Sequence, residues 1–193
     1  MGTPYLMSGT LLLVLVVALT QGAVNLVPNS CPKGVSALPN ARVAEGYCAY
    51  IVASRLYGPR GIVANAAKDT LFLVQKSRQT IRSIGVSEYS YSPTSTNALF
   101  SGHSLNHGIA LSPDERYLYA SSSTTVYRWE YSPFNLRNEE TVIRNIPSGG
   151  HSTRTLYVDP ENGKLVVSCG SGSNLDSDRY MTFLFLKKKK KNL

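Results

Sequence analysis

The stretch NHGIALSPDERYLYASS, residues 106–122, decides the fold, because two other parts of the chain repeat its pattern. The matching stretches are PRGIVANAAKDTLFLVQ at 59–75 and STRTLYVDPENGKLVVS at 152–168. Two sets of equivalent positions recur at intervals of 47 residues, namely Gly61, Gly108, Thr155 and Leu71, Leu118, Leu165. One interval that occurs twice on two sets of anchors indicates an internal structural repeat.

Each repeat has the pattern of a small antiparallel sheet. A short apolar strand is followed by a turn rich in Pro, Asp, Asn or Lys and then by an alternating strand such as RYLYAS, 116–121. The sequence predicts third strands at 79–85, 124–131 and 179–186, and a fourth strand in the second unit at 140–147. Four such strands in about 40–50 residues are typical of a propeller blade, which buries its faces only against neighbouring blades.

We therefore predict an all-β chain that forms an incomplete β-propeller of about two and a half four-stranded blades. Glycines, prolines and serines recur at the strand boundaries, and no segment after residue 50 keeps a helical apolar stripe over three turns. Propellers close with four to eight blades, so these units alone do not complete a ring. The third blade is expected to lack its outermost strand, which leaves an apolar face and an open edge.

The remaining parts of the chain are assigned by composition. LLLVLVVAL, 11–19, has the length of a secretory signal core and is too short to span a bilayer. We predict a signal peptide at 1–22, an N-terminal arm at 23–50, the partial propeller at 51–186, a lysine-rich tail at 187–193 and secretion without a stable membrane span. The segment before the apolar run has no Lys or Arg, so an uncleaved signal anchor stays open as an alternative.

The net charge of +8 arises mainly from five consecutive lysines at 187–191. Without them, 15 basic residues face 12 acidic ones, and no basic helix or aromatic groove indicates nucleic-acid binding, which we exclude. The tail is interpreted as a solvated charge run or as the sign of a truncated reading frame. In an exported chain Cys31 and Cys48 can close a short loop, whereas Cys169 is expected to be a small buried residue.

Candidate site residues lie just before the inner strands of the repeats, where propeller loops gather side chains at one rim. Arg60, His107 and Arg154 occupy equivalent positions, and His103 and His151 are the other two histidines. A basic and cationic channel mouth is one interpretation, and ordinary turn polarity is the other. A zinc site of three histidines is a weak alternative, and 174–178 (NLDSD) lacks the spacing of a calcium loop, so we assign no metal ligands. Triad, P-loop and dinucleotide motifs are absent from the sequence.

NHGIALSPDERYLYASSSTTVYRWEY, 106–131, and GGHSTRTLYVDPENGKLVVSCGSGSNLDSD, 149–178, resemble the soluble quinoprotein sugar dehydrogenases, which include the glucose, sorbosone and pyranose dehydrogenases that depend on pyrroloquinoline quinone. The resemblance covers residues 50–178 and implies a six-bladed propeller that holds the quinone on its axis with calcium beside it. It implies that His151 is the general base, removing the proton of the sugar C1 hydroxyl while hydride passes to quinone C5. It also places His103 near a position that contacts the quinone and implies an external electron acceptor. Arg154 and His107 are expected to contact the cofactor on the basis of their positions at the strand entrances, where the planar guanidinium of Arg154 would suit a carboxylate.

Two departures from the family pattern limit this hypothesis. Ser171 stands where the glucose dehydrogenases have an aspartate that orients the base, and the later blades, which carry calcium ligands and most cationic cofactor contacts, lie beyond these repeats. The main hypothesis is the N-terminal part of an exported sugar dehydrogenase. A non-catalytic propeller binding module is the alternative, and a lactonase-like hydrolase is disfavoured because the inner strands carry no acidic metal ligands.

Overall fold

Three antiparallel sheets dominate the computed structural model, which describes residues 25–87, 90–173 and 183–186. The first sheet consists of β3 (Pro59–Ala64), β4 (Thr70–Gln75), β5 (Thr80–Ser87) and β6 (Ser90–Ser101). The second consists of β7 (Ile109–Leu111), β8 (Tyr117–Ser121), β9 (Val126–Ser132) and β10 (Asn135–Ile143). The third consists of β11 (Arg154–Val158), β12 (Leu165–Cys169) and β13 (Phe183–Leu186).

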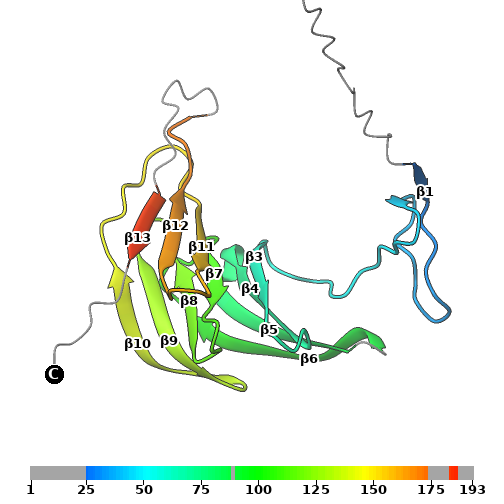
Figure 1. The fold of residues 1–193 in the computed structure, drawn as a ribbon, viewed down its shortest axis with the longest axis horizontal. Coiled ribbons are helices and arrows are strands. Elements are labelled where there is room, and N and C mark those ends of the chain that lie inside the picture. Colours follow the sequence, from blue (N-terminus) through cyan, green and yellow to red (C-terminus); the bar gives the residue numbers. More distant parts are fainter. Residues whose placement is uncertain (1–24, 88–89, 174–182, 187–193) are drawn as a thin grey trace, which may run out of the picture.

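Each sheet pairs its strands in the order of the chain, as a propeller blade does. Two blades have four strands, and three strands of the third are described, so the predicted all-β partial propeller is confirmed. The first strands of the three blades, β3, β7 and β11, lie side by side in the middle of Figure 1, while β6 and β10 lie at the periphery. The helical content of the described residues is a single 3-10 turn, Lys76–Arg78.

Burial explains why the blades must stack, because both apolar cores lie between blades rather than within one. Strand β7 shows this most clearly, since Ile109 packs into the core shared with the first blade and Ala110 into the core shared with the third. The first core consists of Phe72, Val74, Ile81, Leu105, Ile109, Leu118, Ala120 and Trp129. The second consists of Ala110, Val126, Ile146, Leu156, Val158, Leu165 and Val167. The strict alternation along β7 places a two-sided strand between two neighbours.

The glycine of the repeat has a packing role at each inter-blade contact. A Cβ atom added to Gly61 would lie 2.3 Å from the backbone oxygen of His107, and one added to Gly108 would lie 2.4 Å from that of Arg154. Each glycine therefore lets the inner strand of the next blade approach closely. Thr155 holds the equivalent position in the third unit, and it is exposed on the face turned away from the second blade.

The N-terminal arm is a separate two-stranded sheet of β1 (Leu26–Pro28) and β2 (Arg42–Ala44). A disulfide joins Cys31 to Cys48, so the loop that the sequence allowed is formed. The amide of Asn29 supports the same fold, since its nitrogen donates to the carbonyl of Ala49 (2.6 Å) and its oxygen accepts from the Ala49 N–H (2.9 Å). Cys169 is free and only half-buried at the edge of the second core, less buried than expected.

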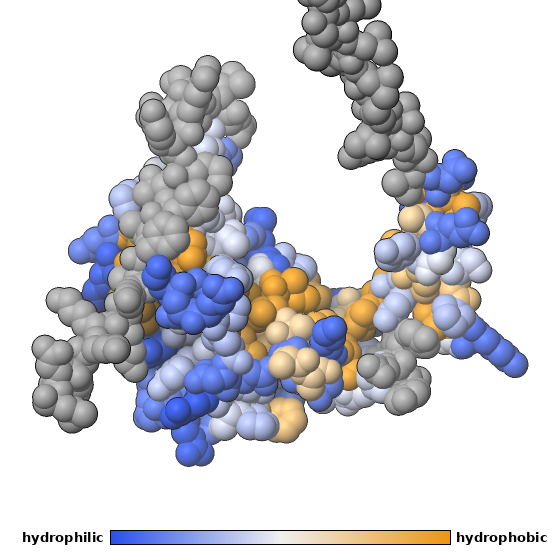
Figure 2. Space-filling model, in the orientation of Figure 1, coloured by the Kyte–Doolittle hydropathy of each residue, from blue (hydrophilic) through white to orange (hydrophobic). Residues whose placement is uncertain are grey.

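Apolar side chains remain exposed on the two outward faces of this row of blades. Ile62 on β3 is 61% exposed and Tyr157 on β11 is 56% exposed. Figure 2 shows hydrophobic surface over the first sheet, where β3 and β4 lie in Figure 1. In the described residues, no helix has the length and apolar character needed to cross a membrane. The predicted signal peptide, the 174–178 stretch and the lysine tail lie outside the described residues.

Candidate active site at the entrance of the inner strands

The predicted site residues at positions 60, 107 and 154 lie where each blade begins its inner strand. Hydrogen bonds across the blade boundaries join these entrances into one rim. The N–H of Gly61 donates to the carbonyl of His107 (3.1 Å), which links the first blade to the second. The Asn106 amide donates to the carbonyl of Ser152 (2.9 Å), which links the second blade to the third. The rim therefore runs from Arg60 to the loop that carries His151.

The backbone of His151 is clamped against the loop that follows β12. Its N–H donates to the Ser171 carbonyl (2.8 Å), and the Gly170 N–H donates to the Thr153 carbonyl (3.1 Å). Glycine is required on both sides of this clamp. A Cβ on Gly170 would lie 2.3 Å from the His151 oxygen, and one on Gly150, whose φ is +57°, would lie 1.8 Å from the Gly172 oxygen. These contacts hold the main chain of the loop in place, and His151 is exposed on it.

Ser171 does not take the orienting role of the family aspartate. Its hydroxyl donates to the carbonyl of Ser173 (3.0 Å), and its own carbonyl accepts from the His151 N–H. No described residue forms a hydrogen bond to the imidazole of His151. The clamp on the main chain therefore fixes the position of the residue, while the ring is open to a ligand or to solvent.

Arg154 is buried, with only 1% of its surface exposed, and its guanidinium turns back into its own loop. Nη1 donates to the carbonyls of Thr153 (2.7 Å) and His151 (3.4 Å), and Nη2 donates to that of Pro147. Its Nε has no partner among the described residues. Sequence reasoning placed this side chain toward a cofactor carboxylate; the structure shows it holding the His151 loop, and the cofactor contact stays untested.

His107 lies at the first blade boundary, where the charge of Arg60 acts on it. Burial and the neighbouring Arg60 charge lower the pKa of His107 below its usual 6.5, which favours the neutral imidazole. Its Nδ1 is buried and lacks a hydrogen-bond partner among the described residues. The second histidine of this loop, His103, is placed differently.

The His103 ring lies beside outer strands. It stacks on Tyr127 of β9, with ring centroids 4.1 Å apart, and its Nε2 is 2.8 Å from a carboxylate oxygen of Glu139 on β10. These contacts do not bring His103 together with His107 and His151 at the inner strands, and its predicted cofactor role stays untested. Asn106 belongs to the rim but was missed from sequence, because its cross-blade bond depends on the neighbouring loop.

The rim has the character of an anion site. Among the described residues, neither Arg60 nor Arg154 has a carboxylate within ion-pair distance. Three buried polar atoms without partners belong to rim residues, namely Asn106 Oδ1, His107 Nδ1 and Arg154 Nε. The part of the chain that the structure describes contains no group of three His, Cys, Asp or Glu residues placed to hold a metal ion. The unpaired charge of Arg60 and the unpartnered Arg154 Nε favour a ligand that carries hydrogen-bond acceptors.

Comparison with known proteins supplies the context for this rim. The TrAA12-like family model matches residues 41–182. The chain is 31% identical over 146 residues to the pyrroloquinoline quinone-dependent sugar dehydrogenase of Hypocrea jecorina, covering 72% of this chain and 34% of the relative. It is 27% identical over 154 residues to the corresponding pyranose dehydrogenase of Coprinopsis cinerea, covering 76% of this chain and 20% of the relative.

A solved structure, the holo form of the quinone domain of the Coprinopsis cinerea pyranose dehydrogenase, is 26% identical with a TM-score of 0.59. It matches 65% of this chain and 31% of that chain. The chain thus spans about a fifth to a third of the length of these relatives. Taken with the blade geometry, the family match over most of the described residues shows that this chain belongs to the TrAA12-like family, in which its relatives are sugar dehydrogenases dependent on pyrroloquinoline quinone.

Proposed function

We propose that this chain supplies the first blades of an exported sugar dehydrogenase that depends on pyrroloquinoline quinone, with His151 as its general base. The observation that carries the proposal is the clamp on His151. Two backbone hydrogen bonds, the Arg154 guanidinium and the Asn106 amide hold the end of the loop between β10 and β11, in which the imidazole of His151 is left exposed. Such a set of supporting hydrogen bonds is expected where the fold must present a side chain at a fixed position.

The residues of the rim fit a quinone that carries carboxylate groups. Arg60, which is exposed, would meet negative charge at the first blade. The Nε of Arg154 and the Nδ1 of His107 have no partner among the described residues but are buried, so they would meet carboxylate or carbonyl oxygens only if their loops moved. When bound, pyrroloquinoline quinone supplies the two-electron oxidising power that no side chain has. Calcium beside the quinone follows from the resemblance alone. Among the described residues, no group of three His, Cys, Asp or Glu side chains is placed to bind it.

The chemistry left to the protein is removal of one proton. Neutral imidazole is abundant near pH 7 and accepts the proton of a sugar C1 hydroxyl, so His151 becomes imidazolium as the C1 hydride leaves. Ser171 is a neutral residue and contributes no charge to stabilise that imidazolium, and its hydroxyl binds the Ser173 carbonyl instead. Stabilisation must come from solvent or from bound ligand, and we expect a weaker base than one paired with aspartate.

The test is reconstitution of a chimera in which residues 51–173 of this chain replace the matching residues of the Hypocrea jecorina relative. With pyrroloquinoline quinone and calcium, the chimera should reduce a dye with aldoses, and His151→Ala should lose most of that activity. The 193-residue chain alone should be inactive. Full activity in the His151→Ala chimera would refute the catalytic assignment and favour a non-catalytic role for these blades.

A further inference from the structure

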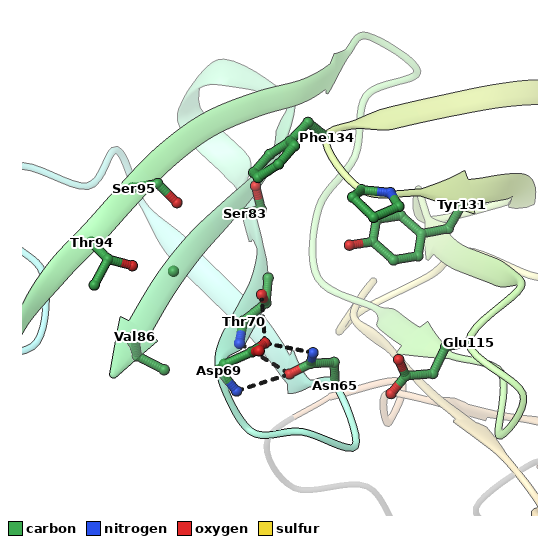
Figure 3. A pocket seen from close by; sticks show the side chains of 12 residues that line it. Asn65, Asp69, Thr70, Ser83, Val86, Thr94, Ser95, Glu115, Tyr131 and Phe134 are labelled. Atoms are coloured by element: carbon green, nitrogen blue, oxygen red, sulfur yellow. Dashed lines mark hydrogen bonds between the residues drawn. The ribbon is translucent and has the colours of Figure 1, made fainter. Parts of the chain in front are cut away.

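A second site lies far from His151 along the chain, between the first two blades, in a cleft of about 570 Å³. It is lined by the turn between β3 and β4, by β5 and β6, by the turn that precedes β8, and by the end of β9 with the turn that follows it (Figure 3). Pockets of 300–1,000 Å³ commonly hold small ligands. Because both walls belong to blades present in this chain, the cleft is formed without any further blade.

An unpaired buried group points into this cleft. Ser83 on β5 is only 4% exposed, and its hydroxyl has no hydrogen-bond partner among the described residues. Figure 3 shows this hydroxyl turned toward the space beside Phe134. A buried polar group without a partner costs free energy, so its place at a cleft wall indicates a ligand or water that completes it.

The two carboxylates of the cleft, Asp69 and Glu115, are both held by hydrogen bonds from the protein. Asp69 accepts hydrogen bonds from the Asn65 amide (2.7 Å) and the Thr70 hydroxyl (3.0 Å), which lower its pKa below 3.8. One oxygen of Glu115 accepts from the N–H of Ala66 across the blade boundary. The pKa of Tyr131 is raised by burial and by these two negative charges, so its hydroxyl stays protonated and can donate.

The mouth of the cleft carries an exposed aromatic ring. Phe134 is 69% exposed and sits in the β9–β10 turn with φ +64°, so its ring is held out at the rim rather than packed in a core. Figure 3 places Phe134 above the space and the Asp69 and Glu115 side chains below it. Aromatic faces bind the flat apolar faces of pyranose rings by the same contacts that pair apolar surfaces elsewhere.

We propose that this cleft is a non-catalytic binding site for a neutral saccharide, in which Phe134 stacks on a pyranose ring while Asp69, Glu115, Tyr131 and Ser83 bind its hydroxyl groups. Saccharide hydroxyls donate hydrogen bonds to carboxylates and accept them from Tyr and Ser hydroxyls. They can therefore pair with both the acceptors and the donors that line the cleft. A bound cation would pair only with the acceptors. In addition, one oxygen of Asp69 already accepts hydrogen bonds from Asn65 and Thr70, and one oxygen of Glu115 accepts from Ala66.

Methyl β-cellobioside is the probe, because it lacks a free C1 hydroxyl and so is not a substrate for oxidation at that carbon. Its binding to the full chain is measured by calorimetry and by saturation-transfer NMR in EDTA without quinone. We expect saturable binding that Phe134→Ala weakens about threefold to tenfold. Tyr47→Ala, which removes a 72% exposed ring in the N-terminal arm, is the matched control and should bind as the parent does.

The outcomes also separate this site from the proposed catalytic rim. His151→Ala should keep the affinity of the parent chain, whether or not the rim oxidises sugars. Equal affinity in Phe134→Ala and Tyr47→Ala, or loss of binding only in His151→Ala, would overturn the proposal. Binding of methylammonium, or of Ca²⁺ in a separate titration without EDTA, in place of the glycoside would also overturn it. Circular dichroism of each variant verifies the β fold, and absence of glycoside binding by the folded parent also overturns it.

Discussion

Gly108→Ala tests the close stacking of the second and third blades. The added methyl group would meet the Arg154 oxygen at 2.4 Å, the Ser121 Oγ at 2.5 Å and the Leu156 Cγ at 2.8 Å. The Arg154 oxygen is a backbone atom of β11, so it cannot move aside by a side-chain rotation. Gly108 is buried, and overpacking in such a place costs about 1–3 kcal/mol, from which we expect about 2 kcal/mol.

Urea unfolding followed by tyrosine and tryptophan fluorescence measures this loss as a lower midpoint at unchanged slope. In thermal unfolding 2 kcal/mol corresponds to a melting temperature about 4–8 °C lower for a domain of this size. Gly149→Ala is the matched control, because nothing lies within 4 Å of its added Cβ and its backbone φ is not positive. If Gly108→Ala and Gly149→Ala agree within about 0.5 kcal/mol, the inter-blade contact is not as close as described.

Three further predictions follow from the arm and the rim. Arg154→Leu should lower the free energy of unfolding by about 2–4 kcal/mol in urea, because three carbonyls lose charged donors, whereas exposed Arg60→Gln should change it little. The lowered pKa of His107 contributes stability that is present above pH 6.5 and is lost as pH falls through the folded pKa. Arg60→Gln should raise that pKa in an NMR titration, so that the loss of stability becomes smaller and is complete at a higher pH. Opening the 17-residue disulfide loop with Cys31→Ser should destabilise the arm by about 3 kcal/mol in protease-protection assays.

The repeat made the fold predictable, because one glycine and one leucine recur at the same strand positions in consecutive blades. Alternation along 116–121 was enough to place β8. Strand β6, Ser90–Ser101, was missed because it is rich in Ser and Thr and lacks an apolar alternation, so its pairing with β5 is the main evidence for it. The fourth strand of the second blade was predicted at 140–147, whereas β10 runs from Asn135 to Ile143, because its first residues are mostly polar and also lack an apolar alternation.

The site was predictable only to the level of backbone position. Register placed Arg60, His107 and Arg154 at equivalent strand entrances, and the structure keeps them there. Side-chain direction was not predictable, because it depends on partners far away in sequence. Arg154 turns toward carbonyls of its own loop, and His103 is drawn away by Glu139 and Tyr127. The saccharide cleft was also hidden, since its walls come from five separate segments.

Chemical rescue of the base tests the central claim most directly. In the reconstituted chimera, His151→Gly should lower kcat for dye reduction by about 10²–10⁴-fold, the usual contribution of a general base. Added imidazole should restore part of that rate in proportion to its neutral form, because the position is exposed and open to a small base. A His151→Gly chimera that keeps the parent rate, or one that binds quinone normally but gains nothing from imidazole, would contradict proton removal at His151.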